Sequence, residues 1–355
     1  MATVLLGIYP AFSHLNASFK VARHLKDSGY RVVYADSTDD FAEVIVMQGF
    51  EFVKIDTGQF PRVGSERYGL PAFVAAYVNE RKQVREMNRF LLQRRMYDQV
   101  IREVRPDLLI IDALLSPFIL LLLPYKIPVF TLQTMFPTEK AQSVPPLHST
   151  IVPDGSRWAT LRIKWAWWKY FAGRKLRQYA NQVRCMGTAP TFENVALLKQ
   201  FARLEDRSLD DFICFRRTLT FRLQNIAELV TSPRELDFPR SPDRNQYFLG
   251  GSIDVSRAEA GIDANYAEAM AKLAQERGDK YKFLIYCAFG TMNPQKSKQF
   301  LSFLRRLMRA FELNRDWQLV LAAGKQFEPV HLGALPANVC VFGKIPQLDI
   351  LQRAD

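Results

Sequence analysis

The chain has 355 residues, of which 48% are hydrophobic and 24% are charged. This length exceeds the ~100–200 residues of a typical domain, so we expect two domains, each with its own core. The composition is that of a globular protein and excludes a mainly disordered chain. The 48 basic and 36 acidic residues give a net charge of +12, which favours an anionic partner: nucleic acid, an acidic membrane surface or a phosphate-bearing substrate.

Cysteine spacing and hydropathy narrow the class of protein further. The four cysteines lack CxxC pairing, so we expect neither a metal site nor a disulfide framework. The first residues lack the basic region of a secretory signal. The apolar run from Leu108 to Leu123 contains Asp112 and Pro117 and is shorter than the ~20 residues that span a bilayer. We therefore expect a cytoplasmic location.

Short apolar segments alternate with helical patterns along the first part of the chain. Glycines at 29 and 49 are placed to end the first two helices. Buried strands that alternate with helices are typical of a parallel, doubly wound sheet and of the α/β class. The expected strands are 4–9, 31–35, 51–55, 108–111, 128–132 and 227–231.

The alternation is interrupted and then begins again. We expect a first domain over 1–250 with helical insertions at about 60–104 and 137–225, and a polar connection over 251–280. A second domain over 281–355 has expected strands at 283–288, 318–322 and 339–342 and a helix at 294–311. The sequence ends after about three of the ~5–6 strands of a mean sheet, so we expect this domain to be incomplete.

The loop after the first strand carries the first candidate for chemistry, His14. Ligands of open α/β sheets bind at the carboxyl ends of the strands, where this loop lies. An imidazole at that edge is suited to removing a proton from a hydroxyl. Asp112 directly follows the strand 108–111 and reaches the same edge, where a carboxylate would orient the imidazole. Taken singly, His14 is more often a packing residue, and Asp112 is as often a helix cap.

Two turns in the second domain are further candidates. Gly290 and Thr291 follow a buried strand, where backbone amides and a hydroxyl can approach phosphate oxygens. Gln347 follows Pro346 at the start of a helix, where its amide can pair with a base or a sugar. Each turn alone is equally compatible with an ordinary strand-to-helix connection.

Together these motifs resemble those of the UDP-glycosyltransferase superfamily, which are nucleotide-sugar-dependent enzymes of the GT-B fold that include the bacterial macrolide and carotenoid types. The resemblance runs through nearly the whole chain. It implies two Rossmann-like domains, an acceptor-binding domain over 1–250 and a partial nucleotide-sugar-binding domain over 281–355. The matching segments are Ser13–Asn16, Ala22–Leu25, Arg105–Asp107 with Asp112, Thr231–Arg234, Tyr247–Gly250, Phe289–Thr291 and Ile345–Gln347 with Ile350 and Leu351.

The resemblance assigns roles to individual residues. His14 becomes the general base and Asp112 the residue that orients it, with Phe12 and Ser13 beside them on the acceptor side. Gly290 and Thr291 would contact the donor diphosphate, and Gln347 the donor nucleoside. The implied reaction is inverting transfer of a sugar from a nucleotide-sugar, expected to be a UDP-sugar, to a hydroxyl of a small lipophilic acceptor. It needs no metal or cofactor.

This chain departs from the family pattern at three points. Ser13 stands where many members have glycine, and Lys344 where many have a tryptophan that stacks on uracil, which leaves the nucleotide open. The His-Gly-Gly type segment that holds the donor pyrophosphate is expected just beyond Asp355. The alternatives are therefore a non-catalytic helper or binding protein, or an inactive fragment. A sugar-nucleotide epimerase fits the motifs less well, and a dehydrogenase is disfavoured because no GxGxxG follows the first strand.

The region 157–177 combines four tryptophans with many basic residues, and no acidic residue occurs between Asp154 and Glu193. One interpretation is an amphipathic helix with a solvated basic face. A second is peripheral contact with the inner membrane surface or a pocket for a greasy acceptor. A third is nucleic acid, because bases stack on aromatic rings. We expect no nucleic-acid partner and retain the first two interpretations.

Overall fold

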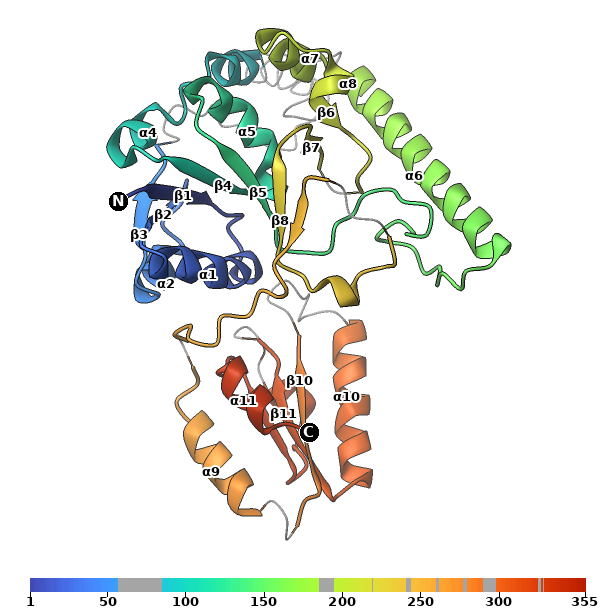
Figure 1. Ribbon diagram of the computed structural model, residues 1–355. Helices are drawn as coiled ribbons and strands as arrows, with labels where there is room; N and C mark the ends of the chain where they lie inside the picture. The colour runs from blue at the N-terminus through green and yellow to red at the C-terminus, as the bar shows by residue number, and fades with distance from the viewer. Residues whose placement is uncertain are drawn as a thin grey trace, which may run out of the picture. The chain divides into compact units, whose positions relative to one another are not determined.

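The computed structural model describes residues 1–56, 85–184, 195–218, 220–240, 244–259, 262–276, 280–289, 298–324, 327 and 329–355. The chain divides into two compact units, an N-terminal unit, Met1–Asp254, and a C-terminal unit, Val255–Asp355. Both contain parallel strands flanked by helices, as the sequence predicts for the α/β class (Figure 1).

The N-terminal unit is built on a seven-stranded sheet in the order β3-β2-β1-β4-β5-β8-β9. Every neighbouring pair is parallel, which requires a crossover between consecutive strands. The carboxyl ends of the strands therefore share one edge. The strands are β1 (Thr3–Gly7), β2 (Arg31–Asp36), β3 (Glu51–Lys54), β4 (Leu108–Asp112), β5 (Val129–Gln133), β8 (Ala227–Val230) and β9 (Gln246–Phe248).

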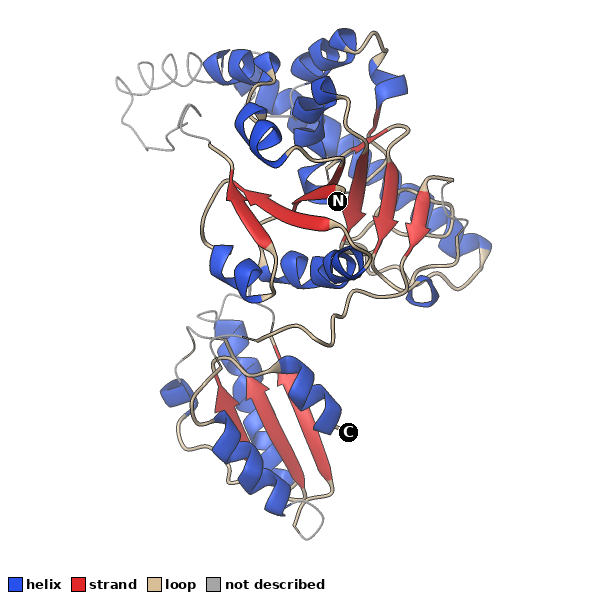
Figure 2. Ribbon diagram, turned by 60° about the vertical axis from the view of Figure 1, so that its left-hand side comes forward, coloured by secondary structure: helices blue, strands red, loops and turns tan. Residues whose placement is uncertain are grey.

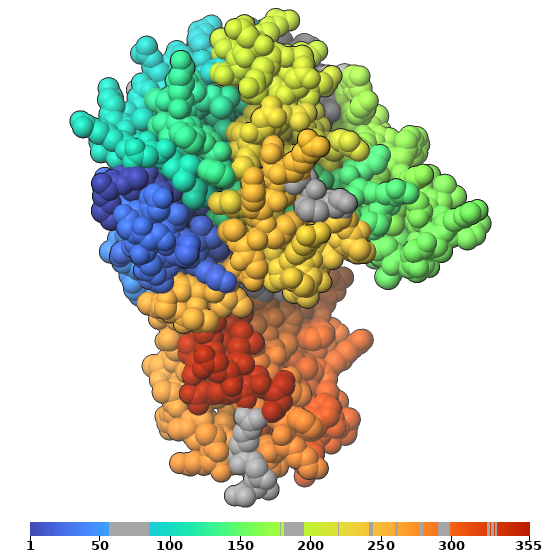
Figure 3. All heavy atoms as spheres, in the orientation of Figure 1, coloured from blue at the N-terminus to red at the C-terminus, as the bar shows by residue number. Residues whose placement is uncertain are grey.

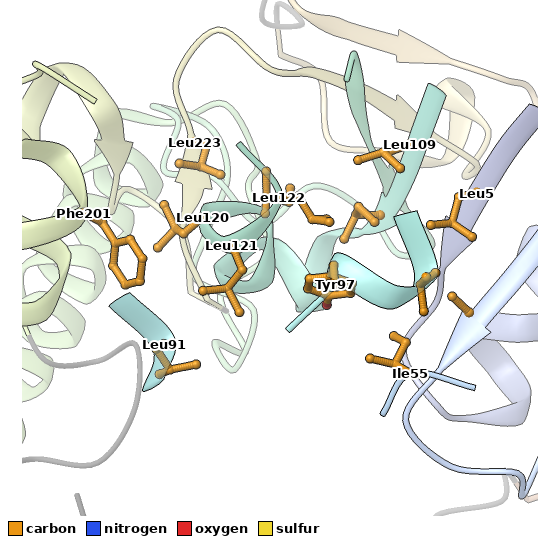
Figure 4. Close-up of a cluster of buried hydrophobic side chains, with 14 of the residues drawn as sticks. Leu5, Ile55, Leu91, Tyr97, Leu109, Leu120, Leu121, Leu122, Phe201 and Leu223 are labelled. Atoms are coloured by element: carbon orange, nitrogen blue, oxygen red, sulfur yellow. The ribbon is translucent and has the colours of Figure 1, made fainter. Parts of the chain in front are cut away.

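Helices cover both faces of this sheet because its buried strands alternate their side chains between two apolar cores (Figure 2). On one face, α1 (Phe12–Asp27) and α2 (Ala42–Met47) pack on Leu6. On the other, α4 (Asp98–Val104) and α5 (Ser116–Leu122) pack on Leu5 and Leu109 (Figure 4). Two short 3₁₀ helices, Ala113–Leu115 and Leu123–Tyr125, flank α5.

Helix α1 ends where the sequence predicts. Gly29 has φ +87° and follows directly after the C-cap residue Ser28. Side chains rarely adopt this left-handed conformation, so glycine ends the helix without strain. The backbone can then turn into β2 at Arg31, which places this strand next to β1.

The insertion after β5 is attached to the sheet through a buried ion network. Its elements are α6 (Arg157–Arg184), α7 (Val195–Leu204), α8 (Leu209–Phe212), β6 (Ile213–Cys214) and β7 (Arg222–Leu223). Arg217 is 2% exposed and pairs with Glu139 and with Glu228 on β8. A charge buried to this extent persists only when it is paired. The insertion is thus fixed to β8.

The C-terminal unit contains a three-stranded parallel sheet of β10 (Phe283–Ala288), β11 (Trp317–Ala322) and β12 (Val339–Phe342). Helix α10 (Lys298–Leu313) covers one face. The other face is covered by α9 (Tyr266–Glu276) and α11 (Gln347–Arg353). The remaining 3₁₀ helices are Arg234–Leu236 in the N-terminal unit and Pro329–Leu332 here.

Several segments differ from the sequence-based expectation. The insertion expected to be helical also contains the antiparallel strands β6 and β7. The expected connection over 251–280 contains α9, whose Tyr266, Met270 and Leu273 pack in the core of the C-terminal unit. These apolar residues recur three or four positions apart, so the polar residues between them form only the outer face. Strand β9 was not predicted, because its three residues are at least partly exposed and show no buried pattern.

Candidate functional site

His14 and Asp112 come together at the carboxyl edge of the N-terminal sheet, although 98 positions separate them in sequence. His14 lies in the first turn of α1, and Asp112 is the last residue of β4. The two strands β1 and β4 are neighbours in the sheet, so the loop after β1 reaches the end of β4. His14 Nδ1 lies 2.7 Å from Asp112 Oδ2. The predicted pairing of these two side chains is present in the structure.

The surroundings of the pair fix the tautomer of the imidazole. Asp112 is fully buried, and its other oxygen, Oδ1, accepts a hydrogen bond from the backbone N–H of Leu114 at 2.8 Å. An ionised carboxylate only accepts hydrogen bonds, so the proton on the histidine ring is assigned to Nδ1. His14 Nε2 then carries a lone pair, and within the described residues it has no hydrogen-bond partner. This arrangement presents a proton acceptor at the sheet edge.

A third side chain reaches the same nitrogen. Thr134 directly follows β5, and its Oγ1 lies 2.8 Å from His14 Nδ1. Sequence reasoning missed Thr134. Its position gave a signal, because it follows the strand beside β4 just as Asp112 ends β4. Tyr9 packs against the imidazole, with its ring centroid 5.2 Å from that of His14.

A mostly apolar cavity of about 240 Å³ opens at the ends of β1 and β2. His14 and Asp112 are not among its lining residues, and Tyr9, whose ring packs on His14, connects the cavity to the pair. Tyr9 forms part of its wall, with Met96, Tyr97 and Phe118 from the face of the sheet covered by α4 and α5. Asp36, at the end of β2, is the one charged side chain among the described residues that line it. Sequence reasoning also missed this carboxylate.

Burial raises the pKa of Asp36 above its ordinary value. The nearby Asp40 raises it further, whereas hydrogen bonds from Ser37 and Thr38 to the carboxylate lower it and offset part of the effect. Asp36 is therefore a polar group in an otherwise apolar wall. Its carboxylate is more readily protonated than that of an exposed aspartate. Such a group can orient a hydroxyl of a ligand.

The two residues expected on the acceptor side lie on α1 next to His14. Phe12 is 38% exposed and packs edge-on against Phe41. Ser13 is exposed. Neither takes part in the hydrogen bonds of the histidine and aspartate pair.

Of the three residues expected on the donor side, only Gln347 lies within the described residues. It is exposed at the start of α11, one residue after Pro346. Its backbone N–H donates to Glu259 Oε2 at 3.1 Å, and its side-chain Oε1 accepts from Arg257 at 3.4 Å. The amide expected to meet a base or sugar thus already has partners within the C-terminal unit. Gly290 and Thr291 lie outside the described residues.

Within the described parts of the chain, no group of three or more His, Cys, Asp or Glu side chains is placed to hold a metal ion.

Comparisons with known proteins identify the relationship. No protein-family model matches the chain. The oleandomycin glycosyltransferase of Streptomyces antibioticus is 46% identical over 138 residues, which are 38% of this chain and 28% of that protein. The NDP-glycosyltransferase YjiC of Bacillus subtilis is 34% identical over 53 residues, 15% of this chain and 13% of its own length. The chain thus matches less than a third of the length of either relative.

Solved structures show the same fold. The glycotransferase of kitacinnamycin superposes with a TM-score of 0.60 at 19% identity, over 99% of this chain and 73% of the other. The calicheamicin glycosyltransferase CalG4 gives a TM-score of 0.55 at 17% identity, over 100% and 72%. Part of the chain is thus similar in sequence to glycosyltransferases, and nearly the whole of it shares the fold of solved glycosyltransferases. This is the GT-B fold, with a Rossmann-like sheet in each unit.

Proposed function

We propose that this chain is an inverting glycosyltransferase of the UDP-glycosyltransferase superfamily. It moves a sugar from a nucleotide-sugar, taken to be a UDP-sugar, to a hydroxyl of a small lipophilic acceptor. His14 serves as general base and Asp112 orients it. The observation that carries the proposal is the 2.7 Å hydrogen bond between His14 Nδ1 and Asp112 Oδ2 at the carboxyl edge of the sheet.

The chemistry follows from this hydrogen bond. With Nδ1 protonated, Nε2 takes the proton of the acceptor hydroxyl as its oxygen attacks the anomeric carbon. The bond from that carbon to the diphosphate oxygen breaks, and the nucleoside diphosphate leaves with the electron pair. A single displacement inverts the anomeric configuration. The buried Asp112 carboxylate stabilises the imidazolium that forms.

The cavity that Tyr9 connects to the pair supports a lipophilic acceptor. Aromatic and aliphatic side chains form most of its wall, which favours burial of an apolar ligand. The Asp36 carboxylate is placed to hold a hydroxyl of that ligand. Phe12 and Ser13, exposed beside the base, complete the acceptor side in this proposal.

Support for a nucleotide-sugar donor comes from the relatives and from charge. The relative YjiC is named an NDP-glycosyltransferase. The net charge of +12 favours a substrate that carries phosphates. Gln347 is proposed to contact the donor nucleoside, and Gly290 with Thr291 its diphosphate, through the motifs that resemble those of the superfamily. No metal or other cofactor is required in this mechanism.

The test is an assay of the 355-residue chain with UDP-sugars, then TDP-sugars, and a panel of lipophilic alcohols. We expect a glycosylated product and an equal amount of nucleoside diphosphate, with inverted anomeric configuration by NMR. A product with retained configuration would contradict the single displacement. Acceptor binding without any nucleotide binding by calorimetry would contradict transfer and favour the non-catalytic alternative.

A further inference from the structure

Helix α6 carries an exposed apolar stripe that the proposed reaction does not use. Trp158, Trp165 and Trp168 are 75%, 61% and 66% exposed. Leu161, Leu176 and Tyr179 are exposed as well. At about 100° per residue, all six positions fall within a sector of about 80° on one side of the helix. Large apolar side chains gathered in this way on a surface mark an interaction site.

Basic residues border this stripe on both sides. By the same helical geometry, Arg162 and Lys169 lie along one edge, and Lys164 and Lys175 along the other. All four are exposed. The Lys169 ammonium lies 5.4 Å from the centroid of the Trp165 ring. No acidic residue occurs between 154 and 193, so the positive charge is not compensated within the helix.

The opposite side of α6 holds the helix on its unit and so keeps the stripe directed outward. Trp167 is 1% exposed, and its indole N–H donates to the Val144 carbonyl at 2.7 Å. Ala159 and Ile163 are buried on the same side. Arg174 donates to the Arg217 carbonyl at 3.1 Å. Figure 1 shows α6 along the outer side of the N-terminal unit, and Figure 3 shows its atoms on the surface.

We propose that this surface of α6, the stripe with its basic borders, binds an anionic lipid bilayer. Tryptophan rings and leucines enter the boundary between headgroups and acyl chains, while the lysines and arginines on both borders contact anionic headgroups. The contact is peripheral: within the described part of the chain, no helix has the length and apolarity to cross a bilayer.

Charge favours this occupant over a second copy of the chain. Two such surfaces facing each other would bring like charges together without an acid between them. Nucleic acid is disfavoured by the arrangement of the cations, which form two borders with the apolar stripe between them. A groove that binds single-stranded nucleic acid instead follows one phosphate backbone, with cations and aromatic rings along the same path.

The test measures binding of the chain to vesicles by co-sedimentation and by the blue shift of tryptophan fluorescence. We expect binding to vesicles with about 30 mol% phosphatidylglycerol to exceed binding to pure phosphatidylcholine at least about tenfold, and to weaken as salt is raised. Replacing Trp158, Trp165 and Trp168 together by serine should reduce binding at least about tenfold. The matched control replaces three apolar residues of comparable exposure away from α6 (Leu236→Ser, Leu313→Ser and Val330→Ser) and should bind as the unmodified chain does.

A second variant tests the charge separately. Lys164→Gln with Lys169→Gln removes two positive charges at exposed positions and should lower binding about 25-fold, since each basic residue near an anionic surface contributes about fivefold. Equal binding to neutral and anionic vesicles would overturn the proposal. So would dimerisation through this surface, or tighter binding to single-stranded RNA than to the vesicles. None of these readouts depends on sugar transfer, so the outcome is independent of the proposed function.

Discussion

The carboxyl edges of the two sheets present their polar residues differently. In the N-terminal unit, His14 is 8% exposed and Asp112 is fully buried, and each has fixed partners that define one tautomer. In the C-terminal unit, Gln347 is exposed, and its bonds to Arg257 and Glu259 are near the long end of the hydrogen-bond range. The buried pair is suited to directing a proton, whereas the exposed glutamine can exchange its partners for a ligand.

The carboxyl groups Asp36 and Asp349 also differ between the two units, in the direction of their pKa shifts. Burial raises the pKa of Asp36 in the cavity of the N-terminal unit. Asp349 on α11 is also partly buried, which raises its pKa, but hydrogen bonds from Arg353 and Tyr266 lower it more, so its net pKa lies below the ordinary value. The pKa of the carboxyl group is therefore raised at one edge and lowered at the other. Substitutions of His14 and Asp112 test the edge of the N-terminal unit, and substitutions of Gln347 and Asp349 test that of the C-terminal unit.

Replacing the base should have the largest effect. His14→Ala removes the proton acceptor and should lower the rate of sugar transfer by about 10²–10⁴-fold. The matched control is His24→Ala, an exposed histidine on the same helix, which should leave the rate unchanged. Steady-state kinetics with a saturating donor measures both variants. Equal rates for the two would show that His14 only packs.

Replacing the orienting acid should have the second largest effect. Asp112→Asn keeps the shape of the side chain but removes the charge that stabilises the imidazolium, and should lower kcat by about 10- to 10³-fold. Asp107→Asn is the control, because Asp107 accepts from the Thr3 backbone at the opposite end of β4. A loss of rate in the control equal to that of Asp112→Asn would point to folding rather than to chemistry. Circular dichroism of both variants checks the fold.

The donor side should respond more weakly. Gln347→Ala removes one exposed side-chain hydrogen bond and should weaken nucleoside diphosphate binding about fivefold, with little change in kcat at saturating donor. Gln352→Ala, an exposed glutamine on the same helix, is the matched control. Isothermal calorimetry measures both affinities. A large fall in kcat would contradict this expectation, because it would show that Gln347 acts at the reacting atoms rather than in nucleoside binding alone.

The smallest effect is expected at Asp349, and it depends on pH. Its pKa is lower in the folded state, so its ion pair with Arg353 contributes stability above the ordinary aspartate pKa of about 4. This contribution is lost as the pH falls through the folded pKa. Asp349→Asn should therefore reduce stability at pH 7 by less than about 1 kcal/mol, because the pair is partly exposed.

Hydrogen exchange of α11 and β10 at pH 7, 5 and 3 measures the effect of this substitution. The difference between Asp349→Asn and the unmodified chain should shrink from pH 5 to pH 3. A difference that grows as the pH falls would reverse the sign assigned to this carboxylate.

The sequence predicted the α/β class, most of the strands and the pairing of His14 with Asp112. It could do so because buried parallel strands are continuous apolar runs, and because residues that follow adjacent strands meet at one edge. It did not predict Thr134 or Asp36, although both stand at the carboxyl ends of predicted strands of the same sheet. It also assigned the residues of α9 to the connection between the two domains. The polar residues of the outer face of α9 separate the three apolar residues that recur at helical spacing.

By itself, the sequence determined which residues can form strands, where glycines end the first helices and which edge carries the histidine and the acid. Only the tertiary structure decided that Asp112 is fully buried with its second oxygen on the Leu114 amide, and that the tryptophans of α6 divide between one buried ring and three exposed ones. The physical reason is that periodicity acts over one or two helical turns, whereas burial depends on which distant segment packs against each face.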